Sequence, residues 1–119
     1  MNRLGRNFAA ALVAALLLAP VLAASAEPTT IAIVASNWKF TPSSIDLHAG
    51  VPTTLKLSSS EGVHGLESPD LGVAKTMLMP GSTTSVVVTP KKTGTYVLHC
   101  AVMCGAGHAD MALTVHVLP

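Results

Sequence analysis

The stretch TYVLHCAVMCGAGHADMALTVHV, residues 95–117, holds two strand-like patterns separated by a segment rich in sulfur and imidazole. In each flank apolar residues alternate with other residues, which is typical of a strand with one buried face. Between the flanks, residues 99–111 contain both cysteines of the chain, two histidines and two methionines. We therefore expect a hairpin whose connecting loop carries a functional site, because a rigid scaffold can position such a loop.

Other segments of the chain show the same period of two. Gly, Pro and Ser clusters separate these short β-rich segments, and we find no helical period of useful length after residue 26. The expected strands lie in TTIAIVAS (29–36), SIDLHAG (44–50), VPTTLKLSSS (51–60) and STTSVVVTP (82–90). This spacing predicts an all-β sandwich or barrel.

The N-terminal residues 1–26 have the pattern of a secretory signal peptide. Arg3 and Arg6 precede an apolar run, and the small residues Ala24-Ser25-Ala26 form a cleavage site. The alternative is an uncleaved membrane anchor, against which Pro20 and the cleavage site argue. We predict a signal peptide at 1–26, a single exported domain at 27–119 and a periplasmic location.

The charge of the chain excludes one class of partner. The net charge is +1, and loss of Arg3 and Arg6 would leave five basic against six acidic side chains. Nucleic-acid binding calls for a basic patch, so we expect no nucleic-acid partner. No second apolar stretch is long enough to cross a bilayer, so we expect no stable membrane span after cleavage.

The loop motif reads Cys100-x3-Cys104-x3-His108-x2-Met111. In an oxidising compartment a cysteine pair is a disulfide by default, but a bridge across three residues closes a short loop and constrains the unfolded chain little. It would also leave the spacing of His108 and Met111 unexplained. Thiolate, imidazole and thioether form a soft ligand set that favours copper. His64, in VHGLESPDLG, is a candidate ligand from elsewhere in the fold. We expect this segment to be a loop at the same end of the sandwich as the motif.

On these motifs the chain resembles the cupredoxin family, and within it the CuA domain of cytochrome c oxidase subunit II. The Cys-x3-Cys-x3-His-x2-Met spacing of that family is matched at all four positions. VHGLESPDLGV resembles its upstream histidine region, MPG its Pro-Gly turn, and NWKFTP its aromatic-rich strand. The similarity covers most of residues 30–118. It implies a cupredoxin-like Greek-key sandwich or barrel and two copper ions.

The resemblance also implies the role of each ligand. Cys100 and Cys104 would bridge the two coppers, and His64 and His108 would each bind one of them. Met111 would be a weak ligand of the copper held by His64. The carbonyl of Val102 would serve the copper held by His108. An electron carrier of this kind does no bond chemistry alone, and it would exchange electrons with a cytochrome c-like partner or a terminal oxidase.

The chain departs from the family in three ways. Val102 stands where the family usually has an acidic residue, and the two N-terminal membrane helices of subunit II are absent. The aromatic cluster that admits electrons is reduced to Trp38 with Phe40 nearby, so Trp38 is either the point where electrons enter or a core aromatic. These departures favour a free-standing periplasmic relay at least as much as an oxidase subunit.

Two other functions remain open at this stage. A mononuclear blue or red copper site could use His64, one cysteine, His108 and Met111. A periplasmic copper carrier would bind Cu(I) and release it to an oxidase. Methionines that served as ligands would support a copper carrier. We expect Met77, Met79 and Met103 to be packing residues instead. An enzyme is the least supported function, because no nucleophile-and-base arrangement is present.

Overall fold

The computed structural model of the protein describes residues 18–20 and 29–119. The expected signal peptide lies outside the described residues except for 18–20, so it and the boundary at residue 26 stay predictions. Within the described part of the chain, no helix has both the length and the apolar character needed to cross a membrane.

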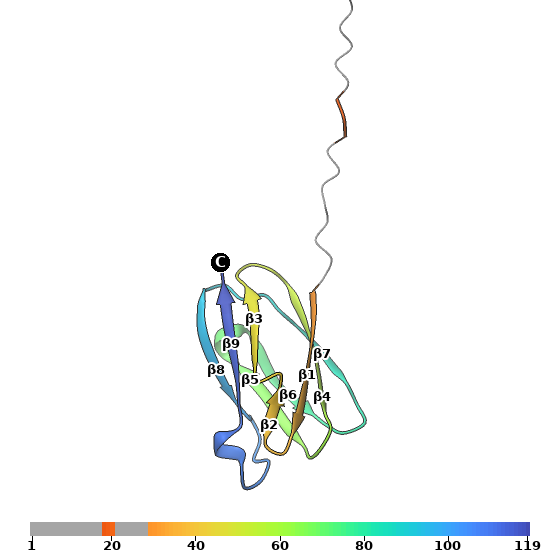
Figure 1. Cartoon of the computed structure of the whole chain (residues 1–119), viewed down its shortest axis with the longest axis vertical. Coiled ribbons are helices and arrows are strands. Elements are labelled where there is room, and N and C mark those ends of the chain that lie inside the picture. Colours follow the sequence, from red (N-terminus) through yellow and green to blue (C-terminus); the bar gives the residue numbers. More distant parts are fainter. Residues whose placement is uncertain (1–17, 21–28) are drawn as a thin grey trace, which may run out of the picture.

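The described residues form nine strands and two short 3-10 helices (Figure 1). The strands are β1 (Thr29–Ser36), β2 (Lys39–Thr41), β3 (Ser44–His48), β4 (Thr53–Ser59), β5 (His64–Ser68), β6 (Val73–Leu78), β7 (Thr84–Val88), β8 (Gly94–His99) and β9 (Ala112–Leu118). The 3-10 helices are η1 (Pro69–Leu71) and η2 (His108–Asp110). The all-β prediction is therefore confirmed.

The strands form three sheets. One has the order β2-β1-β4-β7, the second β3-β9-β8, and β5 pairs with β6 alone. The β1–β4 and β3–β9 pairs are parallel and the other pairs are antiparallel. Parallel neighbours need crossover connections, and here these connections pass between the two larger sheets, as in a sandwich.

The alternation read from the sequence places one face of each strand in the core. In β4 the buried positions are Thr53, Leu55, Leu57 and Ser59, and Leu57 pairs with Ile33 of β1. In β9 the buried positions are Leu113, Val115 and Val117. Burying a large aliphatic side chain contributes about 1.5–3 kcal/mol, so this shared core determines the arrangement of the strands.

Two expectations about the middle of the chain are wrong. We read VHGLESPDLG as a loop, but His64 begins β5 and is fully buried. Met77 and Met79 do not pack, because they alternate with the buried Leu78 and are 40% and 47% exposed. Met103 is 81% exposed on the loop. One face of the β5–β6 hairpin is exposed to solvent. The short apolar run Met77-Leu78-Met79 did not reveal this in the sequence.

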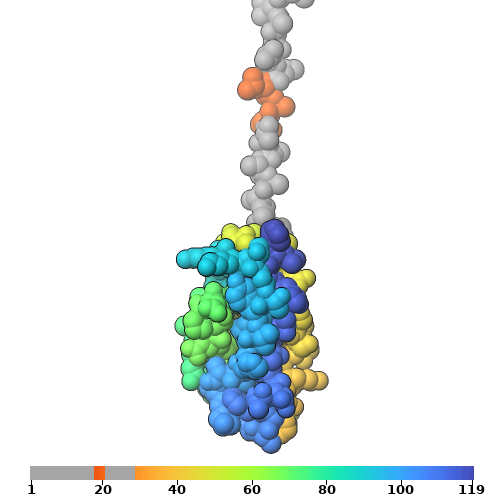
Figure 2. Space-filling view, turned by 90° about the vertical axis from the view of Figure 1, so that its left-hand side faces the viewer, coloured from red at the N-terminus to blue at the C-terminus, as the bar shows by residue number. Residues whose placement is uncertain are grey.

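The loop between β8 and β9 lies at the end of the molecule opposite the C-terminus (Figure 1). In the space-filling view this segment, drawn in blue, covers the lower end, while the β7–β8 connection projects at the upper end (Figure 2). The predicted position of the motif between the last two strands is thus confirmed, and its residues lie together at one end of the sandwich.

Candidate metal centre

Backbone hydrogen bonds hold the motif loop against β5. The Cys100 N–H donates to the Met111 carbonyl at 3.1 Å, which closes the base of the loop. The Ala101 N–H donates to the Gly65 carbonyl at 2.9 Å, which attaches the loop to the residue after His64. These two bonds bring a histidine from the middle of the chain beside the cysteines near its end.

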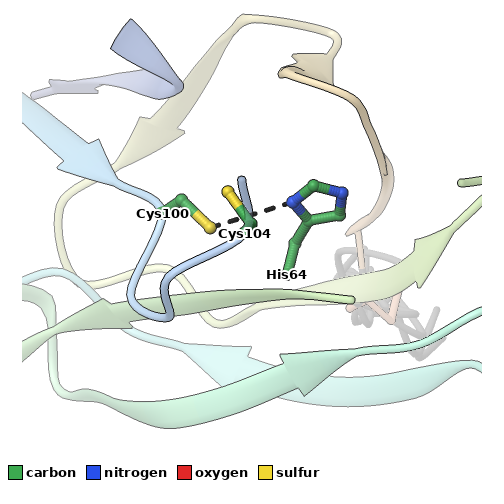
Figure 3. A group of neighbouring side chains, drawn as sticks. All are labelled: His64, Cys100 and Cys104. Atoms are coloured by element: carbon green, nitrogen blue, oxygen red, sulfur yellow. Dashed lines mark hydrogen bonds between the residues drawn. The ribbon is translucent and has the colours of Figure 1, made fainter. Parts of the chain in front are cut away.

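His64, Cys100 and Cys104 converge (Figure 3). Their potential ligand atoms all lie within 4.8 Å of one another, and both cysteines are free thiols. The Cys100 Sγ is 3.9 Å from the His64 Nδ1. Figure 3 shows the two sulfur atoms and the imidazole turned toward a common centre.

The remaining candidate ligands lie beside the two sulfur atoms. The His108 Nδ1 is 3.4 Å from the Cys104 Sγ, and the Met111 Sδ is 3.8 Å from that sulfur. The Cys100 thiol donates to the Val102 carbonyl at 3.3 Å. The structure therefore brings His64, Cys100 and Cys104 together. It places His108, Met111 and the Val102 carbonyl each beside one of the two sulfur atoms, although it does not test their role as ligands.

The imidazole of His64 is oriented by a backbone carbonyl that sequence reasoning missed. Its Nε2 lies 2.8 Å from the Glu61 carbonyl oxygen. A carbonyl can only accept, so Nε2 carries the proton, and in the neutral imidazole the lone pair of Nδ1 faces Cys100. A histidine that ligates a metal is typically held in this way through its other nitrogen. No side-chain pattern could have revealed Glu61, because the contact is made by its backbone.

The thiol of Cys104 is held in its protonated form. Burial raises its pKa from 9.0 to about 11, and the hydrogen bond and the charge of Cys100 act in the same direction. A thiol ligates a metal as the thiolate, so metal binding at this site releases a proton.

Trp38 packs on the motif loop from the β1–β2 turn. Its Nε1 donates to the Cys104 carbonyl at 3.1 Å, and its side chain is 42% exposed. A Cβ added to Gly107 would lie 2.5 Å from the Trp38 Cγ, so only glycine allows this approach. Trp38 thus contacts the loop and the solvent at once. Its role as the point where electrons enter stays a prediction.

The donor set fits copper better than other biological metals. Two thiols and one imidazole nitrogen converge. A second imidazole, a thioether and a carbonyl each lie beside one of the sulfur atoms, and a thioether is a usual weak ligand at copper electron-transfer sites. The lone pair of His64 already faces that centre. The residues present therefore suit copper on the observed geometry.

The family model of the Cupredoxin-like domain matches residues 8–115. The chain belongs to this family. Among curated proteins, the cupredoxin is 29% identical over 88 residues to cytochrome c oxidase subunit 2 of Thermus thermophilus. That match covers 72% of the chain and 63% of the relative, so the chain spans less than two thirds of the relative's length.

Solved structures agree with the cupredoxin fold. The periplasmic domain of subunit II of cytochrome oxidase of Bradyrhizobium japonicum has a TM-score of 0.69 at 16% identity, covering 76% of this chain and 83% of that one. Auracyanin A, a blue copper protein of Chloroflexus aurantiacus, has a TM-score of 0.58 at 17% identity, covering 76% of this chain and 99% of that one. These likenesses establish the fold, and the resemblance to subunit II stated from the sequence is confirmed.

Proposed function

We propose that this cupredoxin is an exported electron carrier with a dinuclear copper centre. The observation that carries the proposal is the second cysteine: Cys100 and Cys104 both turn their sulfur atoms toward the centre that His64 faces. A mononuclear site needs only one thiolate. A pair of thiolates with two imidazoles supplies enough donors for two ions.

Each residue has a defined task in this proposal. Cys100 and Cys104 would be shared by both ions, while His64 and His108 would each hold one. Met111 and the Val102 carbonyl would be weak ligands. Bound copper supplies a one-electron redox couple. The hydrogen bonds from Cys100 to Met111 and from Ala101 to Gly65 hold the loop in place, and a rigid ligand frame limits the rearrangement that accompanies each electron.

We further propose that the partners are a cytochrome c-like donor and a terminal oxidase. The support is the 29% identity to a protein named cytochrome c oxidase subunit 2 and the exposed Trp38 beside the Cys104 carbonyl. Electron transfer without bond chemistry and a periplasmic location belong to the same proposal. Whether the protein acts alone or within an oxidase decides only which partner accepts the electron.

The second candidate is a mononuclear copper site. It is favoured by the fold that this protein shares with the blue copper protein auracyanin A. The two are separated by counting copper in the wild type and in Cys100→Ser after loading under mild reductant. We expect two coppers per wild-type chain and loss of the dinuclear centre in the variant. One copper in both proteins would establish the mononuclear site. Met103→Leu, exposed on the same loop, is the matched control.

A copper carrier gives a different result in the same preparation. It would hold Cu(I), resist oxidation and transfer the metal on mixing with a metal-free acceptor. Strong retention of copper by the wild type, together with reversible oxidation, is the result that our proposal predicts.

A further inference from the structure

Ser59 is a polar residue at a position that the alternation of β4 assigns to the core. Leu55 and Leu57 face inward, and Ser59, the next inward position, is only 7% exposed. A buried hydroxyl costs free energy unless it is hydrogen-bonded. Its contacts therefore show why serine occupies the end of this strand.

The Ser59 hydroxyl organises the turn that precedes His64. Its Oγ is 2.6 Å from the Gly62 carbonyl and 3.0 Å from the Glu61 carbonyl, both of which can accept its proton. It accepts the Glu61 N–H at 3.2 Å. One hydroxyl thus contacts both the N–H and the carbonyl of Glu61. These contacts fix the orientation of the peptide group between Glu61 and Gly62.

The same Glu61 carbonyl accepts the proton of the His64 Nε2 at 2.8 Å. The turn also packs closely on the imidazole, because a Cβ on Gly62 would lie 3.1 Å from that nitrogen and 2.7 Å from the Asn37 Oδ1. A continuous series of hydrogen bonds therefore runs from Ser59 through the Glu61 backbone to the ring. The nitrogen facing Cys100 lies at its far end.

We propose that Ser59 is a positioning residue for the copper centre: its hydroxyl holds the Glu61 carbonyl that sets the tautomer and the donor strength of His64. This inference rests on the proposed function. Hydrogen-bond partners of metal-ligating histidines raise ligand basicity, and their loss typically reduces metal affinity about 10–100-fold. Weakening the imidazole donor removes more stabilisation from the oxidised ion than from the reduced ion, so the reduction potential rises.

The first test uses the metal-free full-length protein and needs no copper. Nitrogen-15 NMR of the wild type should show His64 as the Nε2-protonated tautomer with a slowly exchanging proton. In Ser59→Ala the carbonyl is freed, and we expect a mixture of tautomers and fast exchange. Ser60→Ala is the matched control. Among the residues that the structure describes, the Ser60 hydroxyl hydrogen-bonds only to the Ala35 carbonyl, at 3.4 Å, and the Ser60 N–H already donates to that carbonyl at 2.9 Å.

The second test uses the copper-loaded protein. Ser59→Ala should release copper to a chelator about tenfold faster than the wild type, with a higher reduction potential, while Ser59→Thr, which keeps a hydroxyl, should restore both values. A variant that melts at a lower temperature but keeps the wild-type His64 spectrum and potential would overturn the proposal and leave Ser59 a turn residue. Failure of the proposed function gives a different result, because the wild-type protein itself would then contain no copper after loading.

Discussion

At the scale of single residues, the two methionines of the motif loop differ sharply. Met111 is fully buried and its Sδ lies 3.8 Å from the Cys104 Sγ, whereas Met103 is 81% exposed. The motif spacing already singled out Met111, and burial separates the two methionines in the same way. Met111 alone is placed to contribute its thioether to the centre.

We predict that Met111→Leu keeps the fold and changes the copper centre. The substitution nearly conserves volume, so the free energy of unfolding should fall by less than about 1.5 kcal/mol. Loss of a weak thioether ligand should shift the reduction potential, measured by voltammetry of the copper-loaded protein. Met103→Leu should leave that potential unchanged. Equal potentials for Met111→Leu and the wild type would remove Met111 from the ligand set.

Cys104 leads to a prediction on pH. Its pKa is raised to about 11, chiefly by burial, and alkylation requires the thiolate. In the metal-free protein, alkylation of Cys104, followed by mass spectrometry, should therefore rise about tenfold per pH unit and level off only near pH 11. Because the pKa is raised by folding, this thiol stabilises the metal-free fold below pH 9, and that contribution is lost as the pH rises toward 11. An alkylation rate that levels off below pH 9 would contradict the raised pKa.

At the scale of elements, the hairpin around the motif could be predicted and its surroundings could not. The alternation in residues 95–117 and the Cys-His-Met spacing placed β8, β9 and their loop correctly. β5 was missed because Gly65 and the polar residues of HGLES resemble a turn, and its burial depends on pairing with β6. Glu61 contacts His64 through its backbone carbonyl, and the Ser59 hydroxyl contacts the backbone of Glu61, so neither contact leaves a pattern of paired side chains.

Trp38 and the motif loop pack together through the glycines of CGAG. Gly107 has φ −91° and ψ 8°, which other residues also adopt, so the requirement for glycine there is close packing alone. The contact joins the β1–β2 turn to the loop across most of the chain length.

We predict that Gly107→Ala destabilises the metal-free protein by about 1–3 kcal/mol, because the new Cβ overlaps Trp38. In the Trp38→Ala background the same substitution should cost much less, and urea unfolding of the four proteins gives the coupling. Additive effects of the two substitutions would show that Trp38 does not pack on the loop in solution.

At the scale of the whole molecule, the metal centre adjoins the core of the sandwich: Cys100 and Met111 belong to the buried core, and Val102 and Cys104 pack against it. The core runs between the two larger sheets and consists mainly of aliphatic residues. The β8–β9 loop, which carries both cysteines, lies at the end opposite the C-terminus (Figure 1). Hydrogen bonds within the protein orient His64 and close the base of the motif loop.

We therefore predict that the metal-free protein keeps its β-fold. Circular dichroism should show the same β content before and after copper is removed by a chelator. Copper should raise the melting temperature, since a ligand that binds only the folded state stabilises it. Loss of the β signal on chelation would mean that the metal builds the fold rather than occupying a preformed site.

The central claim is that two coppers share Cys100 and Cys104 in one electron-transfer centre. The most direct measurement is the EPR spectrum of the copper-loaded protein, recorded together with its copper content. The account predicts two coppers per chain and one unpaired electron whose hyperfine splitting is shared equally by both nuclei. Splitting from a single nucleus, with one copper per chain, would contradict it.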